Sequence, residues 1–347
     1  MKAIQITGAN EMACVEMEKP EELKGGEVLV KMNYVGFCGS DLNTYRGGNP
    51  LVNLPVIPGH EVSAEIAALI YLPIAAIGEG VPATLKVGMK VTLNPYSACN
   101  DCPSCRNRRF NACQHNETLG VQRNGAMREY IVMPWEKIIP AEGLDEREIA
   151  LVEPMSVGFH AVDRAQVRDI DVVMVLGCGM IGVGAIVRAA LRGATVIATD
   201  LDDEKLELAK QMGAAYVINT GKEDLHARLV EITGGCGPDV VIEAVGSPFT
   251  QNQAINEIAF TGRVVFIGYA KAGTEFVTKH FVQKELDIRG SRNAMPEDFR
   301  AVIRYMQNNE YPKEKLISAV VKPEDAKAAM EKWMAAPAKV FRILVEF

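Results

Sequence analysis

The chain has 347 residues and a formal net charge of −7, and its length is enough for two domains. Because this charge balance leaves no basic surplus for phosphates, it excludes a nucleic-acid partner. The first residues show no signal-peptide pattern, and the apolar run from Ile66 to Ile77 is shorter than the roughly 20 residues that span a bilayer. We therefore expect a soluble, cytoplasmic protein with no membrane partner.

The first 150 residues are rich in short β-like runs and turn residues, and helical periodicity is weak there. Glu27–Met32 follows two glycines and partly alternates between apolar and polar residues, and Lys90–Leu93 and Tyr130–Met133 are similar. This pattern predicts a mostly-β first domain.

After this region, short apolar strands alternate with helix-like segments. Strands that are apolar throughout predict a parallel sheet covered by helices on both faces, and thus an α/β domain. The segment after residue 290 ends in a predicted strand at 340–347 and is expected to rejoin the first domain. We therefore predict a first domain of residues 1–150 and 291–347 and a second of residues 151–290. The predicted strands of the second domain are 171–176, 194–200, 216–218, 240–244 and 263–267, and its predicted helices are 180–191 and 203–212.

A glycine-rich turn joins the first strand of this predicted sheet to its first helix. The segment Gly177-Cys178-Gly179-Met180-Ile181-Gly182 is a G-x-G-x-x-G, which is a weak signal alone but a strong one between a strand and a helix. Gly177 allows a tight turn, Gly179 lets the backbone approach a pyrophosphate, and Gly182 lets the helix pack on the strand. The free N–H groups at the helix N-terminus then bind the phosphates.

Asp200 ends the next predicted strand, 18 residues after Gly182. A carboxylate there accepts hydrogen bonds from the ribose hydroxyls of NAD and repels the 2′-phosphate of NADP, and Asp202 and Asp203 add to that repulsion. The alternative, coincidental glycines beside a solvated aspartate, does not account for the agreement of glycines, context and acid. We therefore expect NAD as the cofactor.

Four of the eight cysteines fall within fifteen residues, where an even scatter would place roughly a third of one. The spacing Cys99-x2-Cys102-x2-Cys105-x7-Cys113 lets a short lobe fold around one ion, and four thiolates complete its tetrahedral shell. Since a closed shell leaves no position for a substrate, we expect a structural zinc site. Four unpaired or reactive thiols are the alternative.

Three further residues are candidate ligands of a second zinc ion. Cys38 and His60 supply sulfur and nitrogen ligands, although a lone Cys or His is more often a packing residue. Glu153 lies in an apolar segment, where an unpaired carboxylate is costly. Three protein ligands leave a fourth position for water or substrate, which is the arrangement of a catalytic zinc.

Five motifs occur in one fixed order along the chain, and together they are highly specific for a single protein family. They are C-G-S-D at 38–41, G-H-E at 59–61, the four-cysteine lobe, E-P-M-S-V at 153–157 and the glycine turn at 177–182. Over nearly its whole length the chain resembles the zinc-containing medium-chain dehydrogenases. The resemblance implies a GroES-like, mostly-β catalytic domain and a Rossmann domain with a doubly wound parallel sheet. It also implies an NAD-dependent alcohol or polyol dehydrogenase with two zinc ions per subunit, assembled as a homodimer or homotetramer.

The resemblance also assigns roles to individual residues. The implied ligands of the catalytic zinc, which acts as a Lewis acid, are Cys38, His60 and Glu153. Glu61 is a conditional further ligand. Ser40 matches the hydroxyl that passes the substrate proton toward solvent, and the alternative is a turn-capping serine. The further cofactor contacts are Met180, Ile181, Val245 and Gly268.

The substrate class follows from the branch of the family that the chain resembles. Glu153-Pro154 resembles the sorbitol, threonine and sugar-acid dehydrogenases, and residues 284–293 resemble bacterial hexonate dehydrogenases such as those acting on L-galactonate or L-gulonate. The implied reaction is hydride transfer between NAD and a secondary hydroxyl of a polyol or sugar acid. Arg123, Arg292 and Asn293 are candidates to hold a polar or anionic group of that substrate.

Three features depart from the family pattern. Asn43 stands where many relatives have the histidine that ends the proton relay, and Ala64 replaces a usual glycine. The stretch Ala67 to Gly80 is longer and more apolar than in relatives, and we interpret it as an insertion near the entrance of the site.

Two alternative functions stay open. An L-threonine or simple alcohol dehydrogenase shares these motifs. A catalytically silent redox-sensing or interaction protein would keep only the structural zinc and requires a broken catalytic set, whereas Cys38, His60 and Glu153 are all present. Metal content separates a dehydrogenase from the silent protein, since two zinc ions per chain favour the enzyme and one favours the sensor.

Overall fold

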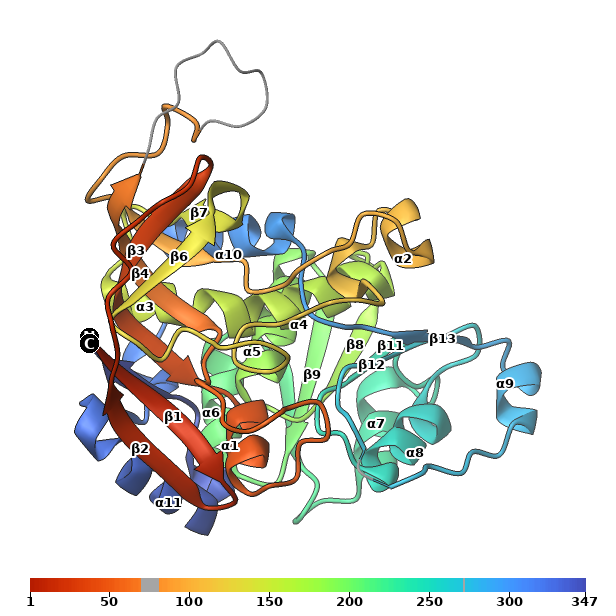
Figure 1. The fold of residues 1–347 in the computed structure, drawn as a ribbon. Coiled ribbons are helices and arrows are strands. Elements are labelled where there is room, and N and C mark those ends of the chain that lie inside the picture. Colours follow the sequence, from red (N-terminus) through yellow and green to blue (C-terminus); the bar gives the residue numbers. More distant parts are fainter. Residues whose placement is uncertain (70–80, 271) are drawn as a thin grey trace. The chain divides into compact units, whose positions relative to one another are not determined.

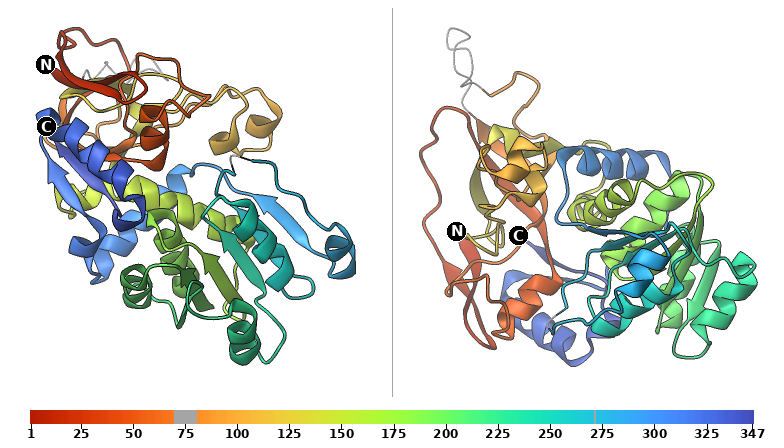
Figure 2. Two further views of the ribbon diagram at one scale, coloured as in Figure 1. Left: turned by 90° about the horizontal axis from the view of Figure 1, so that it is seen from below. Right: turned by 90° about the vertical axis from the view of Figure 1, so that its right-hand side faces the viewer.

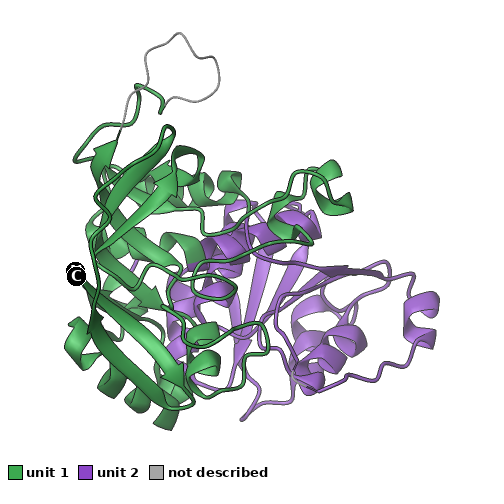
Figure 3. Ribbon diagram, viewed as in Figure 1, with its two compact units in different colours: residues 1–153, 295–309, 313–347 green, residues 154–294, 310–312 purple. Residues whose placement is uncertain are grey.

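The computed structural model describes residues 1–69, 81–270 and 272–347, and the chain divides into two compact units (Figure 3). Unit 1 comprises Met1–Glu153, Met295–Asn309 and Lys313–Phe347, and unit 2 comprises Pro154–Ala294 and Glu310–Pro312. The stretch interpreted as an insertion, Ala67 to Gly80, lies outside the described residues except for its first three, which end a strand.

Unit 1 is built on a seven-stranded sheet with the strand order β14-β15-β3-β4-β5-β7, in which β6 also pairs with β3 (Figure 1). The long strand β3 pairs antiparallel with β4, β6 and β15, so it organises the sheet. The predicted strands at 27–32, 90–93 and 130–133 are confirmed as parts of β3, β5 and β6. The strands are β3 (Glu27–Phe37), β4 (Glu61–Leu69), β5 (Lys90–Leu93), β6 (Tyr130–Pro134), β7 (Ile138–Pro140), β14 (Ala319–Val321) and β15 (Ile343–Glu346).

A hairpin and several short helices complete unit 1. β1 (Lys2–Gly8) and β2 (Glu11–Glu16) form a two-stranded antiparallel sheet. The core of the unit joins β1, β3 and β4 to the last helix, with Phe37 and Trp333 among its buried side chains. The helices are α1 (Gly39–Tyr45), α2 (Pro103–Arg106), α3 (Glu146–Ala150), α10 (Pro296–Asn308) and α11 (Ala326–Ala335). Short 3-10 turns are η1 (Phe110–Ala112), η2 (Trp135–Lys137), η3 (Lys313–Leu316), η4 (Pro323–Asp325) and η5 (Pro337–Lys339).

Unit 2 contains a six-stranded sheet with the order β10-β9-β8-β11-β12-β13, and all neighbouring strands are parallel. Numbered within the unit, this order is that of a doubly wound dinucleotide-binding sheet, with the first strand beside the fourth. The strands are β8 (Val172–Leu176), β9 (Thr195–Asp200), β10 (Tyr216–Asn219), β11 (Val240–Glu243), β12 (Arg263–Phe266) and β13 (Asp287–Gly290). The predicted parallel sheet is therefore confirmed.

Helices connect the strands of unit 2 and cover the sheet (Figures 1 and 2). They are α4 (Val152–Ala165), α5 (Met180–Leu191), α6 (Asp203–Gln211), α7 (Leu225–Thr233), α8 (Pro248–Glu257) and α9 (Lys279–Gln283). The first of these, α4, begins with the last two residues of unit 1 and was not predicted. Among the described residues, no helix is both long and apolar enough to cross a bilayer.

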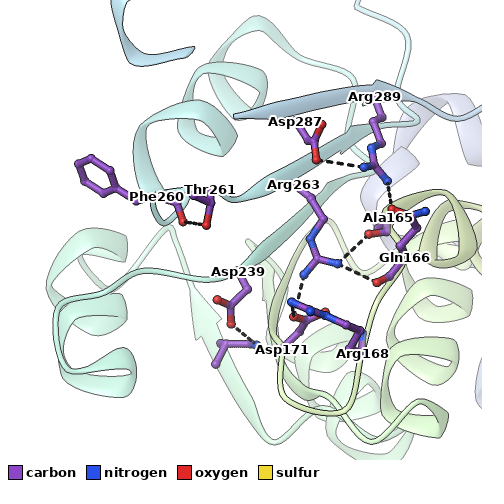
Figure 4. Close-up of polar contacts among 11 residues, drawn as sticks. Ala165, Gln166, Arg168, Asp171, Asp239, Phe260, Thr261, Arg263, Asp287 and Arg289 are labelled. Atoms are coloured by element: carbon purple, nitrogen blue, oxygen red, sulfur yellow. Dashed lines mark hydrogen bonds and ion pairs between the residues drawn. The ribbon is translucent and has the colours of Figure 1, made fainter. Parts of the chain in front are cut away.

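A buried arginine fastens the sheet of unit 2 to the end of α4 (Figure 4). Arg263, at the start of β12, places Nη2 at 2.7 Å from Oδ1 of Asp171, whose side chain is 1% exposed. Its Nη1 donates to the carbonyl oxygens of Ala165 at 3.0 Å and Gln166 at 2.7 Å. The guanidinium therefore neutralises a buried carboxylate and satisfies two carbonyl groups at the end of a helix.

Candidate active site

The pairing of β3 with β4 brings the first candidate metal site together. Gly36, near the end of β3, lies opposite Glu61 at the start of β4, so the residues that follow β3 and precede β4 meet at one edge of the sheet. Cys38 is the N-cap of α1. Asp41 ties both segments together, because its carboxylate accepts hydrogen bonds from the N–H of Cys38 at 2.8 Å and of Gly59 at 3.4 Å.

The resulting group contains one thiol, one imidazole and one carboxylate. The ligand atoms of Cys38, His60 and Glu61 all lie within 4.8 Å of one another. Among the described residues, Nδ1 of His60 and Oε1 of Glu61 are buried without a hydrogen-bond partner, and Oε2 of Glu61 has only an ion pair with Arg342. Buried polar atoms of this kind are normally paired, and thiolate, imidazole and carboxylate are the donors that zinc takes. The residues therefore fit a zinc ion.

Negative charge gathers around His60. Burial alone would lower the pKa of this imidazole, but the neighbouring Cys38, Glu153 and Asp41 raise its pKa well above the ordinary value. The same surroundings favour a metal cation, which carries the positive charge without the proton.

Glu61 also faces an arginine that immediately precedes the last strand. Nε of Arg342 lies 3.1 Å from Oε2 of Glu61, and the two side chains are 6% and 0% exposed. Nη1 of Arg342 donates to the carbonyl of Phe37 at 2.7 Å. Burial raises the pKa of Glu61 to about 7 even though Arg342 opposes the shift. Sequence reasoning missed Arg342, because only the pairing of β15 with β3 brings it here.

Glu153 lies beside this group rather than in it. It is the second residue of α4, is 4% exposed, and acts by its charge on both His60 and Glu61. The hydroxyl of Tyr96, 57 residues earlier in the chain, donates a hydrogen bond to Oε1 of Glu153. No sequence motif pointed to Tyr96.

The four-cysteine lobe forms a second, separate group. The sulfur atoms of Cys99, Cys102, Cys105 and Cys113 lie within 4.8 Å of one another, and none of these cysteines is in a disulfide. Three of the sulfur pairs are separated by 3.6, 3.9 and 4.0 Å. A tetrahedron with metal–sulfur bonds of about 2.3 Å has edges of about 3.8 Å, so the lobe has the size of a zinc site.

Backbone N–H groups prepare this lobe for a cation. The N–H of Cys102 points at Sγ of Cys99 at 3.3 Å, and the N–H of His115 points at Sγ of Cys113 at the same distance. Hydrogen bonds from the N–H groups of Gln114 and Cys105 lower the pKa of Cys102 to about 6. Such donors stabilise thiolates, the form that binds metal.

The glycine turn of unit 2 has the close approaches that its motif predicts. Gly177 has φ of 94°, a conformation that favours glycine. A Cβ on Gly182 would lie 1.8 Å from the carbonyl oxygen of Gly177, whereas a Cβ on Gly179 would meet nothing within 4 Å. Gly179 is the N-cap of α5, and Met180 and Ile181 form the first turn of that helix. The open side of the turn therefore lies at Gly179.

Asp200 closes one side of this turn. Oδ2 of Asp200 accepts a hydrogen bond from the N–H of Cys178 at 2.8 Å, and Oδ1 accepts from Leu201 at 2.7 Å and Asp202 at 3.1 Å. The carboxylate is thus fixed between the ends of β8 and β9, where a ribose could reach its remaining lone pairs.

The other predicted cofactor contacts follow β11 and β12. Val245 is 52% exposed and lies next to Gly177, since a Cβ on that glycine would meet Cγ2 of Val245 at 2.7 Å. A Cβ on Gly268 would lie 2.2 Å from the nitrogen of Gly246. The loop after β11 and the loop after β12 therefore need glycine where they pass each other. These residues line the carboxyl ends of the parallel strands, where ligands bind in open α/β sheets.

The remaining predicted residues are placed as follows. Oγ of Ser40 is buried and has no hydrogen-bond partner within the described part of the chain. Nδ2 of Asn43 donates to the carbonyl of Gly48 at 3.0 Å. Arg123 belongs to unit 1, and Arg292 and Asn293 belong to unit 2.

Comparison with known proteins defines the class to which the chain belongs. It matches the family models described as alcohol dehydrogenase GroES-like domain over residues 24–143 and zinc-binding dehydrogenase over residues 181–308. The protein therefore belongs to the zinc-binding alcohol dehydrogenase family, and the predicted family and fold class are confirmed.

Particular relatives narrow the branch. The L-galactonate-5-dehydrogenase of Escherichia coli (strain K12) is 36% identical over 280 residues, which are 81% of this chain and 80% of that protein. A sorbitol dehydrogenase of Halalkalibacterium halodurans is 34% identical over 325 residues, 92% of each chain. A solved structure described as a short chain alcohol dehydrogenase from E. coli CFT073 complexed with NADH has a TM-score of 0.88 and 29% identity, and the match covers 100% of this chain and 99% of that one. The predicted polyol and sugar-acid branch is thereby confirmed.

Proposed function

We propose that this protein is a zinc-dependent oxidoreductase that transfers a hydride between NAD and a secondary hydroxyl of a polyol or sugar acid. The observation that carries the proposal is the buried group of Cys38, His60 and Glu61, in a chain that also holds the glycine turn and Asp200. Relatives named for L-galactonate and sorbitol support the substrate class.

The chain's own residues have distinct roles in this proposal. We assign the catalytic zinc to Cys38 and His60, with carboxylate ligation from Glu61 or Glu153. Zinc bound there supplies Lewis acidity, which makes a coordinated hydroxyl more acidic. Ser40 is the proposed acceptor of the substrate proton, since its hydroxyl is buried and makes no hydrogen bond to any described residue. Asn43 cannot take that proton further, because an amide does not titrate and its Nδ2 is bonded to Gly48.

NAD is the proposed cofactor, bound at Gly177, Gly179, Gly182 and Asp200. The carboxylate of Asp200, together with Asp202 and Asp203, would repel a 2′-phosphate. The relative solved with NADH supports this choice. The four-cysteine lobe would hold the second, structural zinc.

A screen of NAD reduction tests the proposal. Purified protein with measured zinc content is offered polyols, hexonates, L-threonine and short alcohols, with Cys38→Ser as the matched control. We expect two zinc ions per chain and activity on polyols or hexonates that the variant lacks. Activity confined to L-threonine or ethanol would overturn the substrate class, and one zinc per chain with no activity would overturn the enzyme.

We also propose that the protein is a homodimer or homotetramer, assembled in part through β13. This strand is last in the sheet order, and its Ile288 is 40% exposed. Val282 in α9 and Val277 just before that helix are 84% and 57% exposed. The open edge of a sheet is a site for pairing with another chain, and exposed apolar side chains beside it favour such a contact. Light scattering of wild type and Val282→Asp tests this proposal, and a monomeric wild type would refute it.

A further inference from the structure

A buried tyrosine of unit 1 donates a hydrogen bond to a carboxylate of the candidate metal site. The hydroxyl of Tyr96 is the donor and Oε1 of Glu153 is the acceptor, and each residue is 4% exposed. A phenol has an ordinary pKa of about 10, so it carries its proton at neutral pH and acts as the donor.

The backbone and the ring of Tyr96 both make contacts that hold the residue in place. Its N–H donates to Oδ1 of Asn94 at 3.2 Å, and its carbonyl accepts from Nζ of Lys137 at 2.6 Å. Its ring and that of Phe299 are in edge-to-face contact, with ring centroids 6.3 Å apart and an angle of 71° between the planes. Because the backbone and the ring of Tyr96 are both held, its hydroxyl is fixed in position and can hold the carboxylate to which it donates.

The orientation of the Glu153 side chain matters for the candidate metal site. It belongs to the first turn of α4, lies outside the group of ligand atoms within 4.8 Å, and still acts by its charge on His60 and Glu61. A small rotation of its side chain would therefore change whether a carboxylate oxygen can reach a cation in that group. The hydrogen bond from Tyr96 restricts this rotation.

We propose that Tyr96 is a positioning residue that holds Glu153 beside Cys38, His60 and Glu61 and thereby strengthens metal binding at this site. The inference rests on the proposed function and deepens it. Tyr96 acts through Glu153 and need not touch the substrate. Partners that orient metal ligands typically contribute about 10–100-fold to metal affinity.

Removal of the single hydroxyl tests the inference. Tyr96→Phe keeps the ring that packs on Phe299 and deletes only the donor. Tyr45→Phe is the matched control, because Tyr45 is also fully buried and its hydroxyl donates to the carbonyl of Asn10 at 3.1 Å, away from Glu153. Metal-free wild type and both variants are titrated with Co²⁺ against a competing chelator, and the visible absorption of bound cobalt is recorded. Cobalt in the four-cysteine lobe contributes equally to all three spectra, so differences report the other site.

We expect Tyr96→Phe to weaken cobalt binding about 10–100-fold at this site and to change its absorption bands, while Tyr45→Phe matches wild type. Wild-type affinity and spectrum in Tyr96→Phe would overturn the inference alone, provided that wild type binds two metal ions. Equal losses in both variants would also overturn it, since any buried hydroxyl would then have the same effect. A wild type that binds one metal per chain, at the four cysteines, would overturn the proposed function and the inference together.

Discussion

Gly182→Ala should damage the dinucleotide site by steric conflict. The new Cβ would lie 1.8 Å from the carbonyl oxygen and 2.9 Å from the carbonyl carbon of Gly177, and neither backbone atom can rotate away. Ordinary contact begins at 3.4 Å, so the start of α5 must move from β8 by roughly 1.5 Å. Overpacking of this kind costs about 1–3 kcal/mol. The displaced helix N-terminus would also lose its alignment with the pyrophosphate.

The assays are thermal unfolding and titration of NADH followed by its fluorescence. A loss of about 1–3 kcal/mol corresponds to a fall of roughly 2–12 °C in the unfolding temperature of a unit of this size. NADH affinity should fall at least tenfold in the same variant.

Gly179→Ala is the matched control, because a Cβ there meets no atom within 4 Å. We expect this variant to unfold at the wild-type temperature and to bind NADH weakly, since its methyl group faces the place assigned to the pyrophosphate. Wild-type NADH affinity in Gly179→Ala would refute that assignment. An unchanged unfolding temperature in Gly182→Ala would refute the argument from packing.

Three further outcomes are expected. Cys38→Ser should abolish turnover and reduce zinc from two ions to one per chain, with unchanged circular dichroism, because the four-cysteine lobe is untouched; global unfolding would contradict separate roles for the two metals. Arg263→Met should destabilise the protein by about 3 kcal/mol in urea, since it removes the 2.7 Å partner of the buried carboxylate of Asp171 and leaves Arg168 at 3.6 Å, and Asp171→Asn in the same chain should recover part of that loss. In the metal-free protein the pKa of Glu61 is raised from 4.5 to about 7, so the folded state retains a proton that the unfolded chain has released, and stability should fall as pH rises through this window. Glu61→Gln should flatten that part of the stability profile measured by urea unfolding at pH 5 and pH 8.

Local patterns were enough to predict five of the six strands of unit 2 and its helices α5 and α6. Its strands are continuous apolar runs because both faces of the sheet are buried, and α5 was predicted with the bounds that the structure shows, Met180–Leu191. The four cysteines were found for a similar reason, since all four ligands come from one short segment.

Long-range contacts were beyond such reasoning. Arg342 reaches Glu61 because β15 pairs with β3, and Tyr96 reaches Glu153 across 57 residues. Neither residue type is distinctive in sequence, and neither spacing is periodic, so no local signal could predict these pairs. The helix α4 was not predicted either, although it covers Val152–Ala165.

Unit 1 is interrupted in sequence by unit 2, so its segments are synthesised at different times. A ribosome that adds roughly 5–20 residues per second would spend on the order of ten seconds on residues 154–294, after Cys38 and His60 have emerged and before β15 exists. During that interval β3 has its partners β4 and β6 but not β15, and Glu61 lacks the guanidinium of Arg342. The ion pair between Glu61 and Arg342 is therefore one of the last contacts of unit 1 that the growing chain can make.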